Sequence, residues 1–228
     1  MTGPAGGRLR VAVLISGSGS NLQAIMDAAA ADRIPVDVVA VVSDRADAYG
    51  LARATTAGIP AVCLPGKDYG RREEFDAALG ERLAALEPDL VVLAGFMRIL
   101  TEDLVQAWHG RMLNIHPSLL PAYRGLHTHR RALEAGDAEH GTSVHFVTPE
   151  LDGGPVVAQA RLRVAADDDE ESLTRRIQAM EHRLYPEVVG WYGAGRLRLD
   201  GARILLDGAP LEGPVQRRED ALLRPAEA

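Results

Sequence analysis

The sequence predicts an α/β fold: a Rossmann-like, mostly parallel sheet with helices on both faces, extended by antiparallel strands in the C-terminal half. Apolar runs, such as the one within Leu9–Ile15, interrupted only by Arg10, and Leu90–Ala94, are typical of parallel strands that are buried on both faces. These runs alternate with segments whose apolar residues recur every three or four positions, as expected of helices. The balance of 46% hydrophobic and 25% charged residues is that of a globular domain.

Strands and helices alternate regularly in the first half of the chain. The first helix is expected to begin near Ser20, which forms a capping-box pattern with Gln23. Pro88 ends the third helix, because proline cannot continue a helical hydrogen-bond ladder. The expected strands are 9–15, 36–42, 59–64, 90–94 and 112–115, and the expected helices are 20–32, 46–57 and 71–86.

The second half changes character. Two strand patterns, 142–147 and 155–164, are joined through the turn Asp152-Gly153-Gly154 and are expected to pair antiparallel. Asp168 and Glu171 form a capping-box pattern before a long helix. The remaining expected elements are a short helix at 127–135, the long helix at 170–190 and a hairpin of 196–199 with 204–206. A single domain is therefore expected over 1–207, with 1–7 as a loose leader and 208–228 as a loose tail.

Composition excludes several classes of protein. The formal net charge of −7 argues against broad nucleic-acid binding. No apolar run approaches the roughly 20 residues of a membrane span, and the N-terminus lacks a signal-peptide pattern. The single cysteine, Cys63, forbids an internal disulfide and suits a reducing compartment. We therefore expect a cytoplasmic protein that binds neither nucleic acid nor membrane.

The run Ser16-Gly-Ser-Gly-Ser-Asn21 joins the first strand to the first helix. Its glycines allow a tight turn, after which backbone amides point at a bound anion. A dinucleotide fingerprint fits less well, because its third glycine would fall on Leu22. A nucleotide P-loop is excluded because no Gly-Lys-Ser/Thr follows. The loop therefore favours a monophosphate.

Asn114 and His116 lie at the end of the fifth expected strand and point to the same side of it. Asp152, on a glycine-rich turn, is the carboxylate expected to reach the same edge of the sheet. An amide and a protonated imidazole can stabilise an oxyanion while the carboxylate helps to move protons, which suits acyl transfer to an amine. Direct attack by the amine requires no Ser or Cys nucleophile, so a serine nucleophile is not expected. His127-x-His129 lacks the partners of a zinc site, and no metal is expected.

Six segments resemble the phosphoribosylglycinamide formyltransferase family, the folate-dependent formyltransferases of purine synthesis. These segments are Ile15–Ile25, Val92–Leu100, Asn114–Pro121 with Arg124-Gly125, and Gly141–Val147 with Leu151–Pro155. The resemblance runs from Val11 to about Leu206 and implies the formyltransferase fold. It also implies transfer of a formyl group from 10-formyltetrahydrofolate, a co-substrate, to the amine of glycinamide ribonucleotide, with no bound cofactor.

The resemblance assigns roles residue by residue. It implies catalysis by Asn114, His116 and Asp152, in agreement with the interpretation above. Glu181 would hold the substrate amine. The substrate phosphate would meet Gly19, Ser20, Asn21 and Arg72. The folate would contact Met97, Arg98, Ile99, Leu100, Asn114, Thr148, Pro149, Glu150, Leu151 and Asp152.

Other functions use a similar set of residues. Formyltetrahydrofolate deformylase passes the formyl group to water, and methionyl-tRNA and sugar-nucleotide formyltransferases use other amines. The tRNA enzyme carries an extra C-terminal domain and the deformylase usually carries an N-terminal one, for which 228 residues leave no room. A non-catalytic nucleotide-binding module has no need of the Asn114, His116 and Asp152 set. The sequence leaves open whether the protein is a monomer or a homodimer.

Overall fold

The structure is a computed structural model that describes residues 7–223. The strands are β1 (Leu9–Ile15), β2 (Val36–Ser43), β3 (Ala61–Cys63), β4 (Leu90–Leu93), β5 (Met112–His116), β6 (Glu139–Phe146), β7 (Val156–Arg163), β8 (Leu197–Asp200), β9 (Arg203–Leu206), β10 (Ala209–Pro210) and β11 (Val215–Arg218). The helices are α1 (Ser20–Ala30), α2 (Tyr49–Thr56), η1 (Gly66–Asp68), α3 (Arg72–Leu86), α4 (Glu102–Ala107), α5 (Thr128–Ala135), α6 (Glu170–Gly193) and α7 (Glu219–Leu222).

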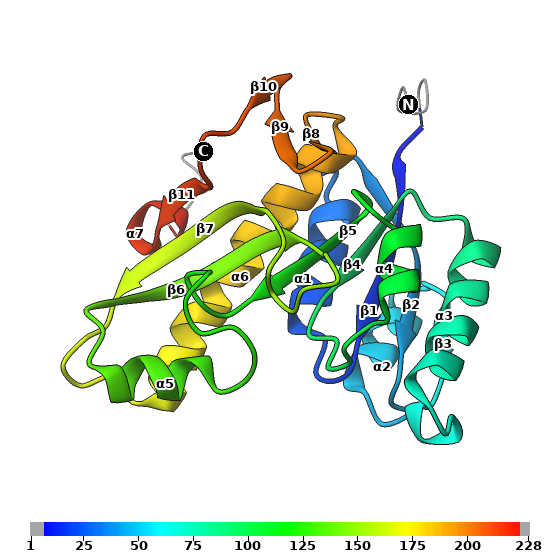
Figure 1. Cartoon of the computed structure of the whole chain (residues 1–228), viewed down its shortest axis with the longest axis horizontal. Coiled ribbons are helices and arrows are strands. Elements are labelled where there is room, and N and C mark those ends of the chain that lie inside the picture. The colour runs from blue at the N-terminus through cyan, green and yellow to red at the C-terminus, as the bar shows by residue number, and fades with distance from the viewer. Residues whose placement is uncertain (1–6, 224–228) are drawn as a thin grey trace.

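The main sheet has eight strands in the order β11-β7-β6-β5-β4-β1-β2-β3 (Figure 1). Strands β3, β2, β1, β4 and β5 run parallel, whereas β6 pairs antiparallel with both β5 and β7. The predicted fold class is confirmed. Strand β5 therefore lies where the parallel half of the sheet meets the antiparallel half.

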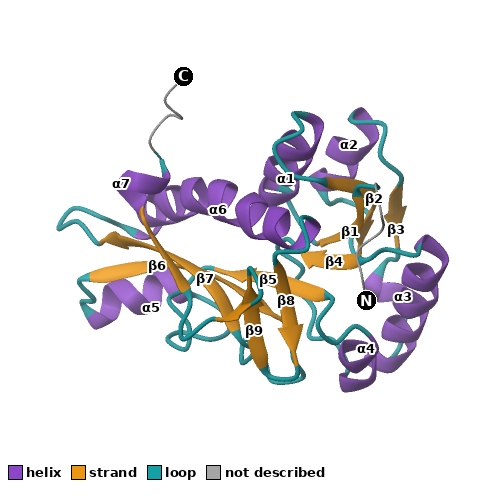
Figure 2. Ribbon diagram, turned by 90° about the horizontal axis from the view of Figure 1, so that it is seen from above, coloured by secondary structure: helices purple, strands orange, loops and turns teal. Residues whose placement is uncertain are grey.

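Alternate residues of β1 enter two separate cores. Val11, Val13 and Ile15 join the cluster that includes α1 and α6, while Ala12 and Leu14 join the cluster that includes α3 and α4. Figure 2 shows these helix pairs on opposite sides of the sheet. A strand covered on both faces needs apolar residues at consecutive positions, which explains the apolar run Val11–Ile15 within β1.

Several local predictions were wrong. Ser20 does not cap α1: the N-cap is Gly19 in the left-handed conformation, and no side chain caps the helix. The capping box of α6 consists of Asp169 and Ser172, whereas Asp168 accepts a hydrogen bond from the Ser172 hydroxyl and forms an ion pair with Arg176. Helix α4 was not predicted, since six residues are too few to show helical periodicity.

The prediction of a loose tail from 208 onward is also wrong for the described residues. Strand β11 pairs parallel with β7, from Val215 opposite Ala158 to Arg218 opposite Arg161. Helix α7 follows, and Glu219 within it pairs with Arg176 of α6 at 2.7 Å. The hairpin β8–β9 is confirmed and is joined by β10. Residues 1–6 of the predicted leader and 224–228 of the predicted tail lie outside the described residues.

Candidate active site

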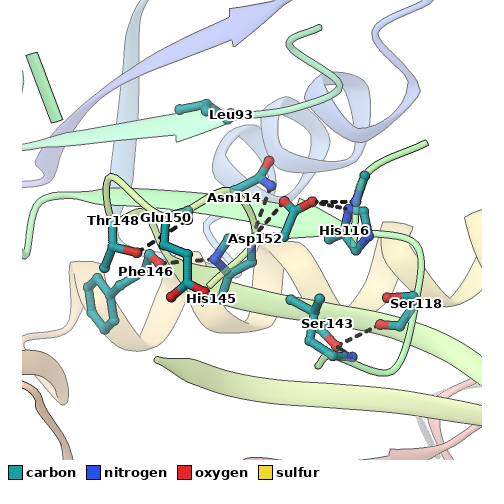
Figure 3. Close-up of polar contacts among 12 residues, drawn as sticks. Leu93, Asn114, His116, Ser118, Ser143, His145, Phe146, Thr148, Glu150 and Asp152 are labelled. Atoms are coloured by element: carbon teal, nitrogen blue, oxygen red, sulfur yellow. Dashed lines mark hydrogen bonds and ion pairs between the residues drawn. The ribbon is translucent and has the colours of Figure 1, made fainter. Parts of the chain in front are cut away.

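The predicted trio of Asn114, His116 and Asp152 is brought together. Asn114 and His116 lie two residues apart on β5, at its carboxyl end, and Asp152 reaches them from the loop between β6 and β7. Figure 3 shows the Asp152 carboxylate between the Asn114 amide and the His116 ring. The side chains of His116 and Asp152 are each 8% exposed, so the pair is shielded from bulk water.

The contacts of His116 show which of its ring nitrogens can gain a proton. Its Nε2 lies 2.9 Å from the carbonyl oxygen of Tyr123. A carbonyl can only accept, so Nε2 must carry a hydrogen. In the neutral ring Nδ1 is therefore unprotonated, and it lies 3.5 Å from Oδ2 of Asp152. A proton gained by His116 is placed on Nδ1, facing the carboxylate.

Backbone groups fix the position of Asp152: the conformation of its own residue and the amide of Gly125. Its own φ of 49° is left-handed, which turns the loop back toward β5. Its Oδ2 accepts a hydrogen bond of 2.9 Å from the amide of Gly125. Its Oδ1 lies 3.8 Å from Nε2 of His145. The carboxylate thus has one anchored oxygen and one that faces the other polar groups of the site.

His145 is a site residue that sequence reasoning missed. Its Nδ1 lies 2.9 Å from the carbonyl of Phe146, so Nδ1 carries the hydrogen and Nε2 has a free lone pair. That Nε2 lies 3.1 Å from Nδ2 of Asn114, which therefore donates to it. Burial lowers the pKa of His145 and keeps the ring neutral. The register of β5 against β6 sets Asn114 directly opposite His145. The sequence does not reveal this register, so His145 could not be predicted from it.

The predicted folate-contacting residues line two adjoining cavities at the trio. An inner cavity is lined by Arg98, Ile99, Leu100, Asn114 and residues 148–152, among others. A catalytic cavity of about 480 Å³ is lined by Met97, Arg98, Ile99, Asn114, His116, Leu151 and Asp152, among others. The structure thus brings every residue of the predicted folate set to one of these two cavities.

A third cavity, the loop cavity, is lined by Ser16–Asn21 together with Gln178 and Glu181 of α6. Gly19 has a φ of 70°, and a Cβ there would come 2.7 Å from the Cα of Gly50. Only glycine fits this position. Because no side chain caps α1, the amides of its first turn remain available to an anion.

Glu181 of α6 lies against the loop of residues 16–21. It is only 6% exposed, and its Oε2 accepts a hydrogen bond of 2.8 Å from the amide of Asn21. Its Oε1 lies 3.1 Å from the hydroxyl of Thr142. Burial raises the pKa of the Glu181 carboxyl. Arg72, by contrast, is exposed at the start of α3 and does not line the loop cavity.

His129 is a second titratable residue that sequence reasoning did not place. It lines both the loop cavity and the catalytic cavity. Its Nδ1 lies 3.0 Å from Nε2 of His140, a buried histidine of β6. Burial lowers the pKa of His140 to about 4, so the inner partner of this pair is neutral. Within residues 7–223, no group of three or more metal-ligating side chains is found.

Comparison with known proteins gives the family. A family model described as formyl transferase matches residues 9–189. The chain belongs to the formyl transferase family. The resemblance seen in the sequence is thereby confirmed.

Individual members of the formyl transferase family are similar over most of this chain. Phosphoribosylglycinamide formyltransferase of Escherichia coli strain K12 is 54% identical over 203 residues, covering 89% of this chain and 96% of that protein. The trifunctional purine biosynthetic protein adenosine-3 of Drosophila melanogaster is 51% identical over 184 residues, covering 80% of this chain and 14% of that protein. The solved structure of phosphoribosylglycinamide formyltransferase from Coxiella burnetii, in complex with CHES, has a TM-score of 0.87 and 48% identity; the match covers 91% of this chain and 99% of that one.

No helix among residues 7–223 combines the length and apolar character needed to cross a membrane.

Proposed function

We propose that this protein transfers the formyl group of 10-formyltetrahydrofolate to the amine of 5-phosphoribosylglycinamide. The products are the N-formyl compound and tetrahydrofolate, in a step of de novo purine synthesis. The observation that carries the proposal is that a loop cavity suited to a phosphate adjoins a catalytic cavity suited to a folate, and that the catalytic cavity is lined by the Asn–His–Asp trio. The two cavities share Gly95, Met97, Ile115, Pro117 and His129.

The reaction needs no covalent enzyme intermediate. The substrate amine attacks the formyl carbon, the new C–N bond forms, and the bond from that carbon to the folate nitrogen then breaks. One hydrogen of the Asn114 amide is held by His145, so the second is free for the developing oxyanion. A proton on Nδ1 of His116 provides another donor, which the oxyanion would share with Oδ2 of Asp152, 3.5 Å from Nδ1. The loss of one such donor costs on the order of 10²–10³ in rate.

Asp152 serves the proton transfers. Its carboxylate stabilises the His116 imidazolium across 3.5 Å and is itself fixed by the Gly125 amide. Its second oxygen can receive a proton from the attacking amine through a water molecule, and the proton is then delivered to the departing folate nitrogen. Positioned acid–base help of this kind is worth roughly 10²–10⁴ in rate.

The remaining predicted contacts fit this arrangement. The first amides of α1, at Gly19, Ser20 and Asn21, would bind the phosphate. Glu181 would bind the ribonucleotide in the same cavity, through its amine as the resemblance implies. The side chain of Arg72 makes no hydrogen bond or ion pair with the other described residues, and it would turn toward the phosphate when substrate is bound. The folate would lie against Met97–Leu100 and Thr148–Asp152. We also propose a cytoplasmic location, which the lone cysteine supports.

The test is to mix the protein with 10-formyltetrahydrofolate in metal-free buffer and to follow tetrahydrofolate, with and without glycinamide ribonucleotide. Rapid formation only in the presence of the ribonucleotide is the expected result. Release of formate without an amine would instead establish a deformylase. No reaction in either mixture would contradict the proposal.

His116→Ala is the matching variant. It removes the donor and the proton carrier but leaves both cavities formed, so kcat should fall by on the order of 10²–10³. Binding of tetrahydrofolate and of the ribonucleotide, measured by calorimetry, should persist. Normal turnover by this variant would show that His116 has no catalytic role.

A further inference from the structure

Asp44, which plays no part in the function described so far, lies next to the site. It directly follows β2, and its side chain is 10% exposed. Its Oδ1 accepts a hydrogen bond of 2.6 Å from the hydroxyl of Ser16, the residue that follows β1. Because parallel strands end at one edge of the sheet, the ends of β1 and β2 are neighbours there.

The hydrogen count at Ser16 shows what this contact does. A serine hydroxyl has one hydrogen, and here Asp44 takes it. The Ser16 oxygen is then left to accept, and it accepts a 2.8 Å bond from the backbone amide of Met97. The Ser16 amide in turn donates to the carbonyl of Gly95 at 3.1 Å. Asp44 thereby sets the orientation of Ser16, and Ser16 joins the loop after β1 to the loop after β4.

These two loops serve different substrates. Ser16 belongs to the wall of the loop cavity, whereas Met97 lines both the loop cavity and the catalytic cavity. A second contact also joins Asp44 to the loop after β4: Oδ2 of Asp44 lies 3.9 Å from Nη1 of Arg98. Arg98 stacks over the Phe75 ring at 4.0 Å and lines both the inner and the catalytic cavity. One buried carboxylate thus contacts the walls of both substrate sites.

We propose that Asp44 is a positioning residue that couples the ribonucleotide site to the folate site through Ser16 and Arg98. This inference rests on the proposed function. A ligand in the loop cavity would stabilise the loop that carries Ser16, and the Ser16–Met97 and Asp44–Arg98 contacts would then favour the geometry that the folate requires. Each substrate therefore tightens the binding of the other, and by thermodynamic reciprocity the two factors are equal.

Calorimetry on the full chain measures this coupling directly. Tetrahydrofolate is titrated with and without saturating glycinamide ribonucleotide, a pair that cannot react because no formyl group is present. The ratio of the two Kd values is the coupling factor. We expect at least about fivefold tighter binding in the presence of the ribonucleotide, the low end of typical couplings.

Three variants separate the two branches. Ser16→Ala breaks the link to Met97 but keeps Asp44 beside Arg98, and the coupling factor should fall to about 2 or less. Asp44→Ala breaks both branches and should bring the factor to 1. Asp44→Asn keeps an acceptor for the Ser16 hydroxyl and loses only the charge beside Arg98, so it should retain more coupling than Ser16→Ala. Asp47→Asn is the matched control, because Asp47 is an exposed aspartate nearby that pairs with Arg45.

The outcomes are distinct. A coupling factor of 1 in the unmodified chain, or an unchanged factor in Ser16→Ala, would overturn the inference. If Asp44→Ala does not fold, comparison of the coupling factors of Ser16→Ala and Asp44→Asn still tests the inference. Failure of the unmodified chain to bind either ligand would overturn the proposed function, and this inference with it.

Discussion

His145 acts on the chemistry through the amide of Asn114. Two carbonyl oxygens, those of Phe146 and Tyr123, fix the tautomers of His145 and His116 respectively. As a result His145 presents a lone pair to Asn114, and His116 presents an unprotonated Nδ1 to Asp152 in its neutral form. An asparagine amide that is free to rotate by half a turn would offer an oxygen instead of a donor to the oxyanion.

Substitution of His145 tests this positioning. His145→Leu should lower kcat by on the order of 10²-fold, because the oxyanion donor loses its orientation. His145→Gln, whose side-chain oxygen can accept from Asn114, should recover part of that loss. Steady-state kinetics at saturating folate separates kcat from KM, and KM is expected to change less.

His182→Leu is the control for His145, because His182 is half-buried on α6 and lines none of the three cavities of the site. Equal losses in the Leu and Gln variants of His145 would show that the ring fills space rather than orients Asn114.

Strand β11 and helix α7 complete the sheet edge that begins at β7. Apart from the strand ladder, Gln216 donates to Gln159 at 3.2 Å, and Arg176 joins Glu219 to Asp168. No residue of β11 or α7 lines the loop, catalytic or inner cavity. Strand β11 thus pairs with the backbone groups of β7 that would otherwise be exposed at the edge of the sheet.

Truncation after Leu211 should therefore lower stability without removing activity. We expect a fall of several degrees in the thermal midpoint, since about 1 kcal/mol corresponds to roughly 2–4 °C in a domain of this size. Glu219→Ala, which loses only the pair with Arg176, should shift the midpoint less. Differential scanning calorimetry and the formyl-transfer assay check the two halves of this prediction. Loss of kcat with an unchanged midpoint would contradict it.

Burial of the Glu181 carboxylate lowers the free energy of unfolding of the whole chain at neutral pH. Its two hydrogen-bond partners, Asn21 and Thr142, are uncharged, and burial raises its pKa. Above the ordinary carboxyl pKa of about 4.3, the unfolded chain loses this proton more readily than the folded one. The folded state then binds more protons than the unfolded state, so stability falls as the pH rises through this range.

Glu181→Gln should remove this cost. The free energy of unfolding of the unliganded variant, from urea denaturation at pH 7, should exceed that of the unmodified chain. The difference should shrink as the pH falls below about 4.3, toward roughly pH 3, where both states carry the proton. Ribonucleotide binding should weaken by about tenfold, since the amide cannot accept at both oxygens. A variant less stable than the unmodified chain at pH 7 would contradict a cost of burying Glu181.

The sequence by itself determined the alternation of strands and helices, the glycine-rich turn after β1, and the trio of Asn114, His116 and Asp152. Each of these depends on periodicity within a few residues or on the rule that ligands bind at the carboxyl ends of parallel strands. Arg72, proposed only through the family resemblance, remains a prediction because the structure shows it exposed.

Only the tertiary structure decided which distant residues support these groups. The bond from Asn21 to Glu181 spans 160 positions, and the Asn114–His145 pair depends on the register of β5 against β6. The pairing of β11 with β7 was missed because a four-residue strand with charged residues has no apolar pattern of its own. Local periodicity is encoded in neighbouring residues, whereas register and burial arise only when the whole sheet and its helices pack together.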